Sequence, residues 1–139
     1  MKKAYPEAAV EYAALIKVLP DDPEGHYGLG AVQLDLNEPK KALAPLLQAE
    51  KLYLADGSPY VSDARTMLSR AYFRLEDWAN AVRYLELILP ATPDDPRLNL
   101  QLGTALTKLK KGATAKPYLM KARERGVNIP ADVAAEAGL

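Results

Sequence analysis

Residues 96–127 have the sequence PRLNLQLGTALTKLKKGATAKPYLMKARERGV, and each half contains a pattern that predicts an amphipathic helix. Three small or apolar residues in each half recur at three- and four-residue steps: Leu102, Ala105 and Leu109, then Ala115, Leu119 and Ala122. Such spacing places side chains on one face of a helix. The two patterns are separated by Lys111-Gly112, which is typical of a turn. The stretch therefore predicts a helix–turn–helix unit.

Both patterns recur along the chain. The first alanine of the second pattern has equivalents, so that alanines stand at positions 8, 42, 81 and 115, separated by 34, 39 and 34 residues. The first pattern occurs as Leu29-Gly30, Leu68-Ser69 and Leu102-Gly103. A small residue at this place suits the close approach of a second backbone. A repeat of this length predicts stacked helix pairs.

Turn residues mark the boundaries between the pairs. Pro20-Asp21-Asp22-Pro23 and Pro93-Asp94-Asp95-Pro96 are two copies of one junction. The second aspartate of each suits a helix N-cap, and the second proline suits the first helical position. Within the pairs, short turns are predicted at three places: Asn37-Glu38-Pro39, Glu76-Asp77-Trp78 and Lys111-Gly112.

This combination of period, Leu-Gly, spaced alanines and exit proline resembles the tetratricopeptide repeat. The resemblance implies an all-α fold, a right-handed superhelix of helix pairs. The expected segments are a half repeat at 1–20, repeats at 23–56, 62–95 and 96–127, and a capping helix at 130–138. The aromatic residue usual early in the first helix is replaced by His26, Arg65 and Asn99.

The 39-residue step is five residues longer than the repeat. The extra length falls near Ala55-Asp56-Gly57-Ser58-Pro59-Tyr60, which predicts a longer loop because loops tolerate insertion at small entropic cost. An alternative interpretation is a loop that touches a partner through Tyr60.

The half repeat at the start lacks its first helix. Its apolar residues Val10, Tyr12, Leu15 and Ile16 would therefore lack one neighbour. We expect either that the chain is a piece of a larger repeat protein or that a second copy covers this end.

Composition argues against several classes of function. The chain of 139 residues has zero formal net charge, no cysteine and one histidine, His26. Nucleic-acid binding needs excess cation, and zinc sites draw mainly on Cys and His. We expect no catalytic residues, metal or cofactor, with the paired aspartates acting as caps. No signal peptide or membrane-spanning segment is recognisable, which favours the cytoplasm but leaves the location open.

The resemblance implies that the first helices of the pairs line a concave groove that holds a peptide or protein segment. By register the contact residues are Tyr27, Leu34, Asp35, Thr66, Arg70, Phe73, Arg74, Leu100, Thr104 and Lys108. Their aromatic, aliphatic and basic side chains favour a partner with apolar and acidic groups.

A structural role is the alternative. The chain would self-assemble through its exposed terminal helix. The uneven charge, −3 over residues 1–60 and +4 over residues 108–139, also suits head-to-tail association of copies.

Overall fold

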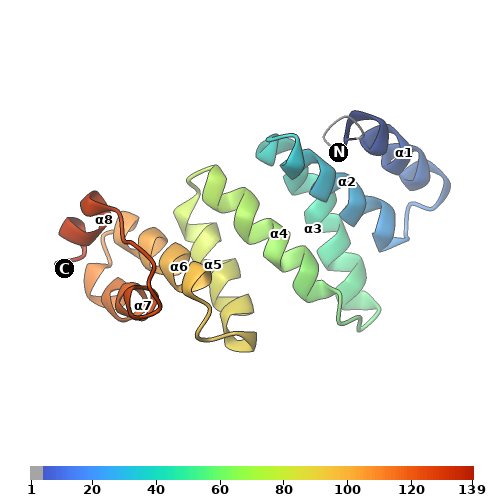
Figure 1. Ribbon diagram of the computed structural model, residues 1–139. Helices are drawn as coiled ribbons and strands as arrows, with labels where there is room; N and C mark the ends of the chain where they lie inside the picture. The colour runs from blue at the N-terminus through green and yellow to red at the C-terminus, as the bar shows by residue number, and fades with distance from the viewer. Residues whose placement is uncertain (1–4) are drawn as a thin grey trace. The chain divides into compact units, whose positions relative to one another are not determined.

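The computed structural model describes residues 5–139, and its regular structure is helical throughout that range (Figure 1). The all-α prediction is confirmed. The chain divides into two compact units, residues 1–75 and residues 76–139, which we call unit one and unit two. The predicted central repeat, 62–95, spans the boundary between them, so the pairing of its two helices stays a prediction.

Unit one contains α1 (Tyr5–Val18), α2 (Pro23–Asp35), α3 (Pro39–Ala55) and α4 (Val61–Arg74). Within this unit α1 contacts α2, α2 contacts α3 and α3 contacts α4, and α2 also contacts α4. Unit two contains α5 (Trp78–Ile88), a short 3-10 turn (Leu89–Ala91), α6 (Pro96–Lys108), α7 (Gly112–Glu124) and α8 (Ala131–Glu136). Here α6 is the central element, because α5, α7 and α8 all contact it.

The predicted caps are confirmed. α2 begins at Pro23 and α6 at Pro96, each directly after its capping aspartate. The Asp22 carboxylate accepts a hydrogen bond from the Glu24 amide at 2.9 Å, and Asp95 accepts from the amides of Arg97 and Leu98. These carboxylates satisfy N–H groups that have no partner within the helix.

The turns inside the helix pairs share a backbone feature that the sequence analysis did not predict. Asn37, Glu76 and Lys110 all have positive φ, between 56° and 63°. Their separations of 39 and 34 residues match the spacing of the repeat. A left-handed residue just past a helix closes its last turn, and in unit two the Lys111 amide accordingly donates to the Leu106 carbonyl at 2.9 Å.

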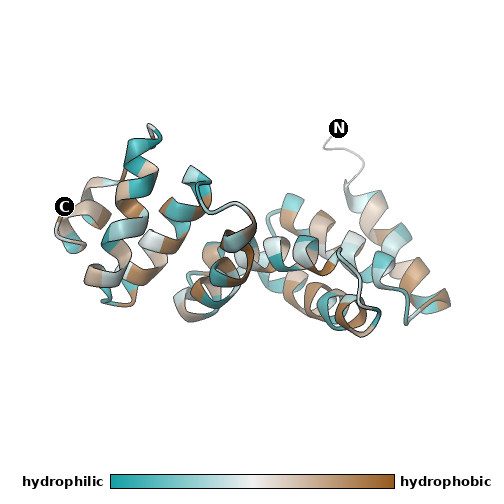
Figure 2. Ribbon diagram, turned by 90° about the horizontal axis from the view of Figure 1, so that it is seen from below, coloured by the Kyte–Doolittle hydropathy of each residue, from teal (hydrophilic) through white to brown (hydrophobic). Residues whose placement is uncertain are grey.

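Glycine sets how closely the paired helices pack. A Cβ atom on Gly30 of α2 would overlap the side chain of Leu46 on α3. The equivalent Gly103 of α6 stands in the same relation to Leu119 of α7. Both leucines are fully buried, so neither helix pair has room for a methyl group at this place. Hydrophobic and hydrophilic segments alternate along the helices of both units, as this packing requires (Figure 2).

The five additional residues of the central step do not lengthen the loop, and that expectation was wrong. α3 continues for 13 residues past Ala42, whereas α7 continues for nine past Ala115. The insertion therefore adds about one helical turn to α3. The following turn, residues 56–60, has five residues, against four between α1 and α2 and seven between α5 and α6.

α1 packs on α2 with one face and exposes the other. Tyr12, Leu15 and Ile16 are half-buried against α2, where Gly25 and Gly28 admit them. Val10, which was predicted on the same apolar face, is instead 70% exposed, and Val18 is 75% exposed. Of the helices within residues 5–139, none is long and apolar enough to cross a membrane.

The contact between Gly30 and Leu46 predicts that Gly30→Ala changes stability differently in the wild type and in a Leu46→Ala variant. Gly30→Ala should lower the free energy of unfolding by about 1–3 kcal/mol, because the buried Leu46 has no room to move. In a Leu46→Ala background the same change should be neutral or stabilising by up to about 1 kcal/mol, because alanine favours the helix. Urea titration followed by circular dichroism measures both values. Equal destabilisation in the two backgrounds would show that the leucine is not the obstacle.

Candidate functional site

The predicted contact residues of unit one lie on two helices that touch, α2 and α4. We call their shared surface the α2–α4 face and define it by Tyr27, Asp35, Thr66, Arg70 and Arg74. Asp35, Arg70 and Arg74 are exposed, and Tyr27 and Thr66 are half-buried. The face therefore presents an aromatic ring, a hydroxyl and charges of both signs to solvent.

Three tyrosines form a connected aromatic cluster at one end of this face. The Tyr27 ring meets the Tyr53 ring edge to face, with centroids 6.3 Å apart, and Tyr53 lies 6.1 Å from the Tyr60 ring. Tyr53 is buried with Ala49 and Ala64, whereas Tyr60 is 58% exposed. Tyr53 thus braces two rings that reach the surface. Contacts of this geometry stabilise beyond the area they bury.

Tyr53 was not predicted as part of the site. It lies in the additional turn of α3. The sequence analysis placed the additional residues in a loop at 55–60, beyond Tyr53. A sequence signal was available, since Tyr53 follows Leu46 and Ala49 at helical spacing. The insertion in the repeat is therefore what supplies the centre of the cluster.

Burial and acidic neighbours raise the pKa values of Tyr53 and Tyr27. The Tyr53 hydroxyl donates to a Glu24 carboxylate oxygen at 3.2 Å. Burial, followed by the charge and hydrogen bond of Glu24, raises the pKa of Tyr53 far above its usual range. Burial also raises the pKa of Tyr27, as does Asp63, while the positive charge of Arg70 acts in the opposite direction. The guanidinium is therefore near enough to affect the Tyr27 hydroxyl.

Two predicted contact residues of unit one have structural roles. Leu34 is only 4% exposed, so its side chain packs in the interior and offers almost no surface to a partner. The Arg74 guanidinium donates to the Leu34 carbonyl at 2.7 Å, at the end of α2 where carbonyls lack helical partners. Phe73, which precedes Arg74 on α4, is half-buried.

The predicted contact residues of unit two lie on α6. Leu100 and Thr104 are half-buried. Lys108 was predicted to offer positive charge to a partner, but its Nζ lies 3.5 Å from Asp132 and 3.9 Å from Glu136, both on α8. In this structure its charge is engaged within the chain.

The replaced aromatic positions hold polar contacts. His26 Nε2 donates to the Pro20 carbonyl at 2.8 Å, and Asn99 Nδ2 donates to the Pro93 carbonyl at 2.9 Å. Each donor thus reaches six residues back to the first proline of its junction. Arg65 instead binds Glu50 of α3 at 3.0 Å. These contacts join consecutive elements and are structural.

The side chains that catalysis or metal binding would use can be located within residues 5–139. No group of three or more His, Cys, Asp or Glu side chains in that range is placed to hold a metal ion. The Ser58 hydroxyl accepts from the Tyr60 amide in a turn, and the Ser69 hydroxyl donates to the Thr66 carbonyl within α4. Both serine hydroxyls thus form hydrogen bonds with nearby backbone groups.

A scan against protein-family models found that residues 3–60 match the model described as Tetratricopeptide repeat. The match covers α1, α2, α3 and the turn before α4. No curated protein matches the chain.

The raised tyrosine pKa values predict loss of stability in alkali. Unfolded tyrosine ionises near its ordinary pKa of about 10, whereas folded Tyr53 ionises higher. The stabilisation is therefore complete below pH 10 and is lost as pH rises above it. Tyr53→Phe should be less stable than wild type at pH 8, because the Glu24 hydrogen bond is gone, and this gap should narrow towards pH 11.

Melting temperatures measured by circular dichroism from pH 8 to pH 11 check this expectation. Tyr60→Phe is the matched control, because Tyr60 is exposed and makes no such hydrogen bond to Glu24. A gap between Tyr53→Phe and wild type that is constant with pH would contradict the role of ionisation.

Proposed function

We propose that this chain holds a peptide or protein segment on its first helices, because residues 3–60 match the tetratricopeptide repeat model and such repeats generally mediate protein–protein interactions. In unit one this surface is the α2–α4 face. By register, Leu100, Thr104 and Lys108 of α6 are the equivalent positions in unit two, and they belong to the same proposal. Phe73 of α4 is included as an apolar contact.

The observation that carries the proposal is an exposed arginine on the same α2–α4 face as a braced tyrosine. Arg70 is exposed on α4, and its charge acts on the half-buried Tyr27 hydroxyl of α2. Tyrosine and arginine are the side chains that most often dominate binding energy at interfaces. A guanidinium can bind a carboxylate through two parallel hydrogen bonds. The partner segment should therefore place an acidic group at Arg70 and an apolar side chain against Tyr27 and Tyr60.

Preorganisation supports the same conclusion. The rings of Tyr27 and Tyr60 contact the buried Tyr53, and Tyr53 is bonded to Glu24. Rings held in place before binding lose less conformational entropy when a partner arrives. Family members of this kind are typically interaction modules without enzymatic activity, which agrees with the structural roles of His26, Ser58 and Ser69.

Arg70→Glu tests the proposal. Peptides selected from a displayed random library on the wild-type chain should be enriched in acidic and apolar residues. Arg70→Glu should weaken their binding by about tenfold or more, because a charge-assisted hydrogen bond is replaced by repulsion. Fluorescence anisotropy measures the affinity, and circular dichroism checks that helical content is unchanged.

Lys51→Glu is the matched control, since it makes the same charge reversal at an exposed position of α3. Arg74 is unsuitable as the main variant, because its guanidinium binds the end of α2. Equal affinity of wild type and Arg70→Glu for the selected peptides would contradict the proposal.

A second candidate function is self-assembly through α1. No residue of α1 is buried, and Val10 and Val18 are exposed. Isolated exposed apolar residues are common, but two on one terminal helix suit an interface between copies. The neighbouring Leu19 is exposed as well.

Light scattering across a concentration series tests this candidate. The apparent mass of the wild type should rise with concentration, and Val10→Glu combined with Val18→Glu should hold it at the monomer value. Leu54→Glu on α3 is the control, because Leu54 is similarly exposed but lies on a different helix. A wild type that stays monomeric well above micromolar concentration would exclude assembly through α1.

A further inference from the structure

α8 is a short acidic helix that lies on α6 and reaches the start of α7. Its residues Val133 and Ala137 are buried. A Cβ atom on Gly112, the first residue of α7, would lie 3.2 Å from the Glu136 carbonyl oxygen, so α8 sits closely against that helix start. The apolar contact of the α8 segment with the rest of unit two is therefore small, because it buries only two of its own side chains, Val133 and Ala137.

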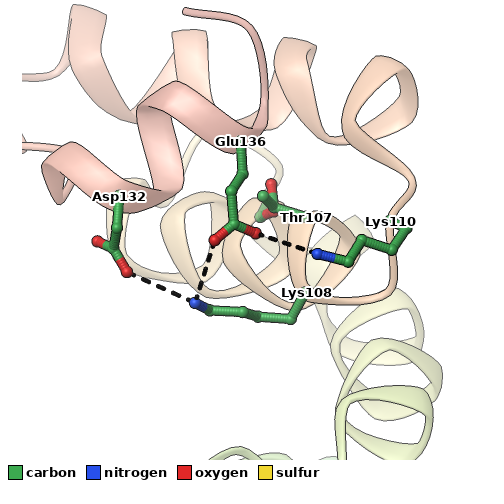
Figure 3. Close-up of polar contacts among 6 residues, drawn as sticks. Thr107, Lys108, Lys110, Asp132 and Glu136 are labelled. Atoms are coloured by element: carbon green, nitrogen blue, oxygen red, sulfur yellow. Dashed lines mark hydrogen bonds and ion pairs between the residues drawn. The ribbon is translucent and has the colours of Figure 1, made fainter.

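Two carboxylates of α8 point at two lysines of the α6 end. Figure 3 shows Asp132 and Glu136 directed at Lys108, and Glu136 also directed at Lys110. The distances are 3.5 Å from Lys108 Nζ to Asp132 and 3.9 Å for both pairs of Glu136. Asp132 and Glu136 are four residues apart, which places them on one face of the helix. The lysines thus receive a matched pair of carboxylates.

We infer that α8 is an internal ligand that occupies the lysine end of α6 and competes there with an acidic helical segment of a partner. The inference deepens the proposed function, since Lys108 is one of its contact residues. The partner's segment should copy what α8 presents: two carboxylates one turn apart, with small apolar residues on the adjoining face. Binding at this end would then require α8 to leave.

The contacts of α8 suit such an exchange. A helix as short as α8 is not stable alone and depends on its contacts with α6 and with the start of α7. All three ion pairs involve exposed or partly exposed side chains, which makes each weak and sensitive to salt. A further cation, Lys116, lies near the residue that follows α8, since its Nζ would be 3.9 Å from a Cβ on Gly138. A segment of the same chemistry supplied in trans could therefore replace α8.

Amide exchange measured by NMR tests how α8 is held. The amides of Ala134, Ala137 and Leu139 donate to carbonyls within this segment, so they report its opening. Their exchange should become about three- to tenfold faster in Asp132→Asn combined with Glu136→Gln, and also in the wild type on going from low to high salt. Unchanged exchange under both conditions would show that the lysines do not hold α8.

Gly112→Ala loosens the same helix without touching a charge. The added methyl group would press on the Glu136 carbonyl and the Ala137 backbone, so the same amides should exchange faster. This variant keeps both carboxylates and both lysines. It therefore separates the contribution of backbone packing at Gly112 from the contribution of the ion pairs.

Competition is tested with a labelled peptide of residues 130–139 added to the full chain. Asp132→Asn combined with Glu136→Gln should bind it about three- to tenfold more tightly than the wild type, because the internal competitor is weakened. Adding Lys108→Gln and Lys110→Gln to that variant should remove the gain. A control peptide with Asn and Gln in place of the two acids should bind neither chain.

Equal binding of the acidic peptide by wild type and by Asp132→Asn with Glu136→Gln would overturn the inference, as would equal binding of the control peptide. Either failure leaves the test of Arg70 standing, because Arg70 belongs to unit one and these variants belong to unit two. Loss of the Arg70 effect with the α8 effect intact would instead reject only the proposed face in unit one.

Discussion

The contact between a helical glycine and a buried leucine is the constraint on which the helix pairs depend. Gly30 meets Leu46 in unit one, and Gly103 meets Leu119 in unit two. Without a Cβ at these places the two backbones approach closely, and the leucine fills the space that a methyl group would need. The close approach seats α2 on α3 and α6 on α7, and it leaves the other faces of α2 and α6 available. The surfaces proposed for α2 and α6 therefore depend on two glycines that are themselves buried.

Much of the fold could be predicted because its signals are local. The N-caps at Asp22 and Asp95, the Leu-Gly positions and the spaced alanines each depend on a few neighbouring residues. The additional turn of α3 was missed, because the turn-forming residues 56–60 follow it directly and the whole insertion was assigned to them. The helical spacing of Leu46, Ala49 and Tyr53 was the signal that the helix continues.

The candidate site was predicted less completely, and the reasons are geometric. A single residue step rotates a side chain by about 100° around a helix, so register alone placed Leu34 in the groove when it lies in the interior. The role of Arg74 at the end of α2 joins residues 40 positions apart, and that of Lys108 joins residues 24 apart. Sequence spacing carries no information on such contacts. Tyr27 and Arg70, by contrast, are both accessible on their helices, although their part in binding stays a prediction.

His26 and Asn99 show how far two copies of one motif can diverge while keeping the same geometry. An imidazole in one repeat and a carboxamide in the other each donate to the first proline carbonyl of the preceding junction. In these two copies the position holds a donor of the right reach rather than an aromatic ring, whereas Arg65 of the third copy donates to Glu50 instead. Unlike side chains can therefore occupy one place in the motif and make the same bond. A recognition profile built on aromatic bulk alone would undervalue repeats that have taken this route.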